Sequence, residues 1–170
     1  MKKIYFGGNF KFKYTEYSIK NISNDYRARI LGSVDELLHK PADGMYKIGK
    51  DIAYCGPFYF YEEGTDGAGV VKNELEMVDN CTHAIFVVDN ASIPGTVSEI
   101  VHASLKHKDI AIFYVKQELD ESEPEKSICN ANWYPIEIAK QVANAYIVEC
   151  PDREIAEELA YNYVDFLKRG

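Results

Sequence analysis

Short apolar runs alternate along the chain with longer segments in which apolar residues recur at helical spacing. Five runs have the length and composition of β-strands: residues 2–8, 50–61, 83–89, 109–115 and 144–150. The third and fourth runs, HAIFVVD and DIAIFYV, are almost continuously apolar and rich in β-branched side chains. Such runs are typical of strands that are covered on both faces of a sheet.

The segments between these runs predict helices. The clearest is 151–169, where Pro151 and Asp152 precede an amphipathic stretch that ends in Lys168 and Arg169 before a glycine. Segments 24–40, 70–81 and 96–107 have the same periodicity, although Gly32 interrupts the first of them.

Strands that alternate with helices predict right-handed βαβ units and a parallel sheet with helices on both faces. The chain contains no repeat, no low-complexity tract and no linker composition. We therefore expect a single α/β domain over residues 1–170. Its expected fold is a flavodoxin-like or Rossmann-like three-layer sandwich around a central, mostly parallel five-stranded sheet.

In sheets of this kind, ligands bind at the carboxyl ends of the strands, so the residues that follow each strand are the candidates for a binding site. The four aromatic residues 58–61, which follow Gly56-Pro57, alternate between the two faces of the sheet, so only half of them can face a ligand. The candidate substrate-binding residues are Gly7, Gly8, Asn9, Phe58, Asp89, Asn90, Gly95 and Thr96.

The composition and the net charge exclude some classes of binding partner. The chain has 170 residues, of which 46% are hydrophobic, and carries a net charge of −8. This charge argues against wrapping nucleic acid or docking on anionic lipid, and it favours a small-molecule or protein partner. No secretory leader or membrane-length apolar segment is visible, so we expect a cytoplasmic protein with reduced cysteines.

The cysteines and histidines predict no metal site. The four cysteines are widely spread and form no Cys-x-x-Cys pair, and the histidines do not have the spacing of metal ligands. We expect neither a metal nor another cofactor.

The segment IPGTVSE brings a carboxylate close to the start of a predicted helix. With Gly95 or Thr96 as the N-cap, Glu99 falls at or near the third helical position, which is the pattern of a capping box. The structural interpretation is that Glu99 only caps the helix. The functional interpretation is that the helix N-terminus keeps Glu99 ionised at the ligand-binding edge.

Two further acids are expected near the same edge, because Glu74 lies on the helix before HAIFVVD and Asp89 ends that strand. Several carboxylates in one cleft indicate glycosyl chemistry, in which one acid attacks the anomeric carbon and another transfers protons.

The segments KIYFGGNF, NELEMVDNCTHAIFVVD and IPGTVSEIVHAS resemble the nucleoside 2-deoxyribosyltransferase family. The family pattern is an opening strand ending in small residues, an acid–leucine helix start, an apolar strand ending in Asp, and Gly-Thr-x-x-Glu at the next helix. The similarity covers residues 2–9 and about 70–105, and beyond residue 115 it rests on element order alone.

The resemblance implies an enzyme that exchanges or cleaves an N-glycosidic bond. Glu99 takes the place of the nucleophile that attacks C1′ and forms a covalent glycosyl-enzyme. Glu74 takes the place of the acid that transfers protons. Tyr5 takes the place of a tyrosine that lies beside the nucleophile. Members of the family are homo-oligomers with shared active sites, whose partners are small nucleosides and nucleobases rather than nucleic-acid polymers or membranes.

Two departures from the family pattern affect specificity. The acid–leucine position, usually Asp, is Glu74, which keeps the carboxyl group but changes its reach. Six residues before the nucleophile, where many members have an Asp that contacts the leaving base, this chain has Ile93. Asp89 and Asn90 are the candidates to compensate for it.

Three alternatives to transfer remain open from the sequence. The first alternative is a hydrolase of nucleosides or of nucleoside 5′-monophosphates, with Lys11 and Lys13 as candidate phosphate contacts. The second is an enzyme that cleaves a larger glycosidic substrate such as a dinucleotide. The third alternative is a nucleotide-binding sensor that has lost catalysis, since fold does not fix function. The turn PGTVSE also resembles that of nucleotide phosphoribohydrolases but lacks its central glycine pair.

Overall fold

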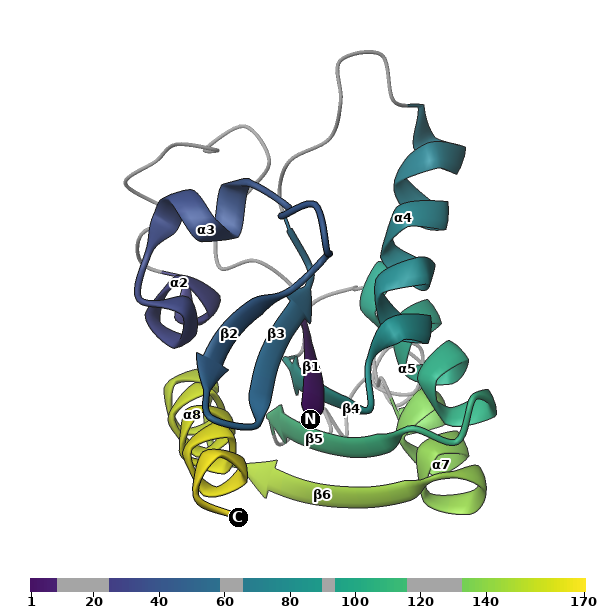
Figure 1. Cartoon of the computed structure of the whole chain (residues 1–170). Coiled ribbons are helices and arrows are strands. Elements are labelled where there is room, and N and C mark those ends of the chain that lie inside the picture. The colour runs from purple at the N-terminus through teal and green to yellow at the C-terminus, as the bar shows by residue number, and fades with distance from the viewer. Residues whose placement is uncertain (9–24, 59–65, 90–93, 116–132) are drawn as a thin grey trace.

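A computed structural model describes residues 1–8, 25–58, 66–89, 94–115 and 133–170. Its strands and helices alternate along the chain in the order expected of an α/β protein (Figure 1). The strands are β1 (Lys2–Gly8), β2 (Tyr46–Gly49), β3 (Ile52–Gly56), β4 (His83–Val88), β5 (Asp109–Val115) and β6 (Asn144–Cys150). The helices are α2 (Tyr26–Leu31), α3 (Val34–Leu38), α4 (Gly67–Asn80), α5 (Pro94–Leu105), α7 (Trp133–Val142) and α8 (Arg153–Arg169).

The strands form one six-stranded sheet in the order β2-β3-β1-β4-β5-β6. The five predicted strands are confirmed, and each pairs in parallel with its neighbour among the five. The structure adds β2, a short strand that pairs antiparallel with β3 at the sheet edge. Its sequence, YKIG, contains no apolar run, and three of its four residues are only half-buried, which is why the hydrophobic pattern did not predict it.

Helices cover both faces of the sheet, as a three-layer sandwich requires. In Figure 1, α4, α5 and α7 lie on one side of the sheet, and α2, α3 and α8 lie on the other. Because alternate residues of a strand point to opposite faces, the central strands β1 and β4 contribute side chains to both interfaces. The buried residues of β4, from Ala84 to Val88, are therefore packed by α5 on one face and by α8 on the other.

Helix α8 begins and ends as predicted, but its apolar residues divide between two faces. Asp152 caps the helix by accepting a hydrogen bond from the Ile155 backbone N–H at 2.8 Å. The face packed on the sheet consists of small and branched residues, Ala156, Ala160, Val164 and Leu167. The larger residues Ile155, Leu159 and Phe166 are instead exposed, and Leu159 and Phe166 line a surface pocket with Phe113 and Tyr146 of the neighbouring strands.

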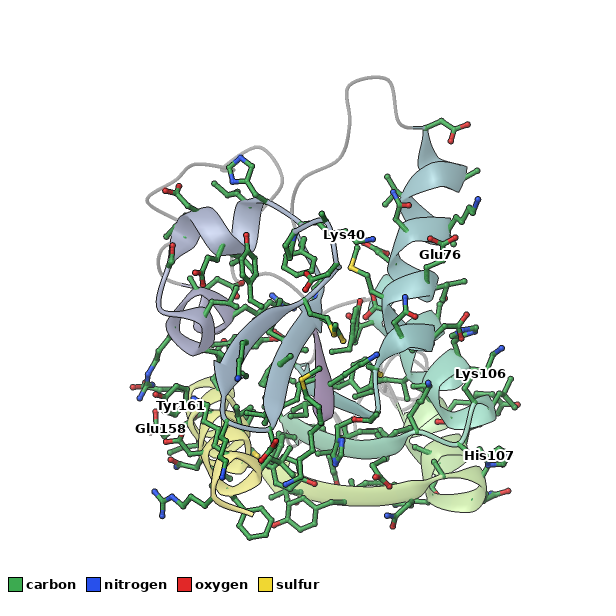
Figure 2. All side chains as sticks on the ribbon, in the orientation of Figure 1. Lys40, Glu76, Lys106, His107, Glu158 and Tyr161 are labelled. Carbon is green, nitrogen blue, oxygen red and sulfur yellow. The ribbon has the colours of Figure 1, made fainter. Side chains whose placement is uncertain are left out.

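Helix α2 is joined to α8 on the outside of the molecule. Arg29 donates a hydrogen bond to the Glu158 carboxylate at 2.8 Å, and its guanidinium lies 3.9 Å from the centroid of the Tyr161 ring. Figure 2 shows Glu158 and Tyr161 on the outer side of α8. This contact is solvent-exposed, so we expect it to contribute little to stability.

No helix in the described part of the chain combines the length and the apolar composition that crossing a membrane requires.

Candidate active site

Glu99 lies in the second turn of α5 and not in the first. The helix begins at Pro94, so the prediction that Gly95 or Thr96 is the N-cap, and with it the capping box, is wrong. Thr96 is a buried helical residue, and Gly95 is exposed with no atom within 4 Å of an added Cβ. Glu99 is therefore too far along the helix to bond the free backbone N–H groups of the first turn.

The Glu99 carboxylate is buried against the bare backbone of β1. Its side chain is only 8% exposed, and its Oε2 lies 2.9 Å from the position that a Cβ on Gly7 would occupy. Two ring carbons of Phe86, on the neighbouring strand β4, lie 2.5 Å from the same position. The absence of a side chain at Gly7 is thus what allows the carboxylate and the Phe86 ring to approach the strand.

Tyr5 lies on the same face of β1 as Gly7, because the two residues are two positions apart. Its hydroxyl is fully buried and, within the described part of the chain, is the only buried side-chain polar atom without a hydrogen bond of regular geometry. Burial raises the pKa of Tyr5 well above its usual value, and the charges of Glu99 and Glu74 raise it further. The phenol therefore remains protonated, with its O–H beside the Glu99 carboxylate and available as a donor.

The surroundings of Glu99 raise the pKa of its carboxyl group to about 7. Burial is the largest cause, and the charge of Glu74 adds to it, whereas the hydrogen-bonding interaction with Tyr5 and the positive charge of Arg27 oppose it. The expectation that the helix N-terminus favours the ionised form is therefore reversed, because desolvation in the second turn outweighs the helix dipole. Near neutral pH, Glu99 exists in both protonation states.

Glu74 comes from the middle of α4 and is half-buried. Helix α4 packs on both α5 and β1, and the charge of Glu74 acts on Glu99 and on Tyr5. The three residues predicted to be catalytic, Tyr5, Glu74 and Glu99, therefore lie together on one face of the sheet. Pairs of carboxyl groups with different environments are typical of sites that carry out acid–base and nucleophilic chemistry.

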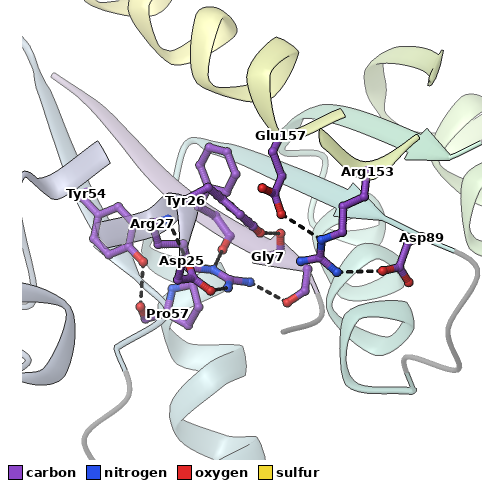
Figure 3. A network of polar contacts seen from close by, with 11 residues as sticks. Gly7, Asp25, Tyr26, Arg27, Tyr54, Pro57, Asp89, Arg153 and Glu157 are labelled. Carbon is purple, nitrogen blue, oxygen red and sulfur yellow. Dashed lines mark hydrogen bonds and ion pairs between the residues drawn. The ribbon is translucent and has the colours of Figure 1, made fainter. Parts of the chain in front are cut away.

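The carboxyl end of β1 is fixed from the other face of the sheet by α2 (Figure 3). Arg27 donates from Nε to the Phe6 carbonyl at 2.8 Å and from a terminal nitrogen to the Gly8 carbonyl. The Tyr26 hydroxyl donates to the Gly7 carbonyl, between them, at 2.9 Å. Three consecutive carbonyl groups at the end of β1 are thus bound by two neighbouring side chains of α2.

Sequence reasoning missed Tyr26 and Arg27. Both side chains are buried, Arg27 with 1% exposure, and Arg27 also donates to the Asp25 carboxylate at 3.0 Å. The only signal in the sequence is an acid two positions before an arginine at a helix start, which also occurs in exposed helices.

The other predicted residues of this edge have structural contacts. Asp89 accepts a hydrogen bond from Arg153 at 2.7 Å, and Arg153 also donates to Glu157 at 2.8 Å, which ties the end of β4 to α8 (Figure 3). Asp89 is therefore engaged on the α8 side of the sheet and is a poor candidate for the base contact that the sequence resemblance assigns to position 93. Gly8 has φ +136°, and a Cβ there would meet the Val87 carbonyl and the Tyr26 hydroxyl.

Phe58 is fully buried, with its ring packed edge-on against Tyr46 at 5.8 Å and Tyr54 at 5.4 Å between centroids. The structure thus places it in the core. The predicted residues Asn9 and Asn90, together with Ile93, Lys11 and Lys13, lie outside the described residues. Among the residues that are described, no three His, Cys, Asp or Glu side chains are grouped so that they could hold a metal ion.

A Gly7→Ala substitution tests the close approach at β1. The added methyl group would overlap the Phe86 ring and contact the Glu99 carboxylate, so we expect a loss of about 2 kcal/mol in the free energy of unfolding. Urea unfolding followed by circular dichroism measures this loss. Gly67→Ala is the control, because a Cβ added there would have no other side chain within 4 Å. This substitution should leave stability unchanged or raise it slightly. Equal unfolding midpoints for the two variants would contradict the packing described for Gly7.

Comparison with known proteins supports the fold. No family model matches the chain, and no curated protein matches it. Among solved structures, the chain is similar to that of the Clostridium botulinum CMP N-glycosidase BcmB, with a TM-score of 0.54 and 14% sequence identity. The similarity covers 98% of this chain and 99% of that one. At this identity the likeness concerns the fold alone, and it confirms the expected flavodoxin-like or Rossmann-like α/β architecture.

Proposed function

We propose that this protein cleaves the N-glycosidic bond of a nucleoside or a nucleoside 5′-monophosphate, with Glu99 as the nucleophile. The observation that carries the proposal is the buried Glu99 carboxyl, which lies over the bare backbone of Gly7 and beside the buried hydroxyl of Tyr5. One solved structure with a similar fold is that of a CMP N-glycosidase, which supports the same class of reaction.

In the proposed first step, the ionised Glu99 carboxylate attacks C1′ of the sugar. The C1′–N bond breaks, its electron pair leaves with the base, and an ester forms between Glu99 and C1′. The two carboxylate charges oppose each other, so the proposed reactive form has Glu99 ionised and the proton on Glu74, which transfers that proton to the departing base. Tyr5 donates a hydrogen bond to the carboxylate and fixes its orientation.

In the second step, a nucleophile attacks C1′ from the other side and releases Glu99, so that the original configuration is restored by two inversions. Glu74, now ionised, accepts the proton of that nucleophile. If the nucleophile is a second nucleobase, the reaction is the sugar transfer that the sequence resemblance implies. If it is water, the reaction is hydrolysis.

The raised pKa of Glu99 predicts how the rate depends on pH. Only the ionised carboxylate of Glu99 is nucleophilic, so the acid side of the kcat/KM profile should rise about tenfold per pH unit and bend near pH 7. A profile of kcat/KM measured from pH 5 to pH 8.5 tests this expectation. A profile that is flat from pH 5 upward would mean that Glu99 is already ionised there, contrary to its buried environment.

Product analysis tests the proposed function itself. Deoxyribonucleosides, ribonucleosides and their 5′-monophosphates are each incubated with the protein, with and without a different free base, and separated by chromatography. A new nucleoside indicates transfer, and free base without a new nucleoside indicates hydrolysis. Substrates that bind but are recovered unchanged would contradict the proposal and favour a nucleotide-binding sensor.

A further inference from the structure

We propose that Arg27 is a positioning residue for Glu99: it fixes the end of β1 under the Glu99 carboxylate and supplies a buried positive charge to the same cluster. The inference rests on the proposed function only in giving Glu99 a catalytic role. Arg27 lies on α2, on the opposite face of the sheet from α5, so it acts through the strand and through its charge.

The mechanical part of the inference follows from the hydrogen bonds of Arg27. Its planar guanidinium binds the Phe6 and Gly8 carbonyls, which flank Gly7 on both sides. The Glu99 carboxylate approaches Gly7 so closely that a methyl group there would touch it. A small displacement of this strand end therefore changes the position of Gly7 relative to the carboxylate. A lysine cannot replace the guanidinium, because its single ammonium group lacks the planar fork.

The electrostatic part follows from the groups that act on Glu99. They come from three elements: Tyr5 on β1, Glu74 on α4 and Arg27 on α2. Glu74 disfavours the ionised carboxylate, whereas Arg27 is the cation among these groups and favours it. The same cation also opposes the rise in the pKa of Tyr5. Because Arg27 is almost fully buried, solvent screens its charge less than that of an exposed arginine.

The Arg27 guanidinium forms a buried ion pair with Asp25, so a variant that tests the charge of Arg27 must also remove the charge of Asp25. Removal of Arg27 alone would leave the Asp25 carboxylate buried without its 3.0 Å partner, which commonly unfolds proteins. The double variant Asp25→Asn/Arg27→Met removes both charges together. Asparagine also keeps the ability to cap α2, where Asp25 accepts from the Arg27 backbone N–H.

The test measures the pH at which Glu99 ionises, by NMR titration of its side-chain carboxyl carbon, which the Glu99→Gln variant assigns. In the double variant we expect this pH to rise by about half a unit. Arg29→Met is the matched control, because Arg29 lies on the same helix but is exposed and bonded to Glu158; it should leave the titration unchanged. A folded double variant that titrates like the wild type would overturn the electrostatic part.

Two further variants keep the inference testable. Asp25→Asn/Arg27→Gln takes the place of this double variant if the latter does not fold, since it also removes both charges and glutamine can still donate hydrogen bonds. Arg27→Lys keeps the charge but loses the fork, so we expect a fall in kcat of about tenfold with little change in KM. Wild-type kcat in Arg27→Lys would overturn the mechanical part. If no nucleoside is cleaved but the titration still shifts, the proposed function fails and the role of Arg27 remains.

Discussion

Replacement of Glu99 by glutamine is expected to lower the rate of N-glycosidic cleavage by at least about 10³-fold. Glutamine has nearly the same shape as glutamate but cannot form the glycosyl ester, so substrate binding should survive while the first chemical step is lost. Chromatographic assay of free base, together with a binding titration of the same nucleoside, separates the two effects.

The matched control for this loss is Glu76→Gln. Glu76 lies on α4 two residues after Glu74, is exposed, and has Lys72 at 3.9 Å as a surface partner. We expect the activity of Glu76→Gln to remain within about twofold of the wild type, since substitutions on the surface rarely affect an active site. Comparable activity in Glu99→Gln and Glu76→Gln would remove Glu99 from the mechanism.

The same Glu99→Gln variant should be more stable than the wild type at alkaline pH. The folded protein holds the pKa of Glu99 at about 7, against 4.5 for a free glutamate. Between these two values the unfolded chain has already lost the proton and the folded chain has not, so stability falls as pH rises. Over this interval the loss amounts to about 3 kcal/mol, and above pH 7 it is constant.

Urea unfolding at pH 4, 6 and 8 measures this effect. The variant should match the wild type at pH 4 and exceed it by about 3 kcal/mol at pH 8, because glutamine has no charge to bury. An advantage of the same size at every pH would show that packing, and not the buried charge, is responsible. A residue whose ionisation destabilises the folded state is retained for a reason other than stability, and this is common at functional sites.

The sheet was predictable because its central strands are buried on both faces. Continuous apolar runs such as HAIFVVD have no other common explanation in a chain with helical segments between them. The edge strand β2 carries no such signal, since three of its four residues are only half-buried and the fourth is an exposed lysine. Edge strands depend on one neighbour for their hydrogen bonds, and pairing with β3 determines that β2 forms.

The candidate site was predictable in its residues but not in its electrostatics. Glu99, Glu74 and Tyr5 were identified from the resemblance, yet the start of α5 was placed at Gly95 or Thr96. A proline is favoured at the first position of a helix, and Pro94 occupies that position. The resulting shift places Glu99 one turn deeper in the helix, where burial controls its ionisation.

The support for the site from α2 was not predictable from local sequence. A buried arginine has the same sequence context as an exposed one, and Arg27 is distinguished from Arg29 only by the tertiary contacts that each makes. The carbonyl groups that Arg27 binds belong to β1, about twenty residues earlier in the chain. Only the assembled structure brings the two segments together.

The most direct test of the central claim is to detect the ester between Glu99 and the sugar. The protein is incubated with a nucleoside that carries fluorine at C2′, which slows both steps, and is analysed by intact-protein and peptide mass spectrometry. We predict a mass increase equal to one fluorinated sugar, located on the peptide that contains Glu99 and absent in Glu99→Gln. Release of base with no adduct, or an adduct on another residue, would contradict the proposed role of Glu99.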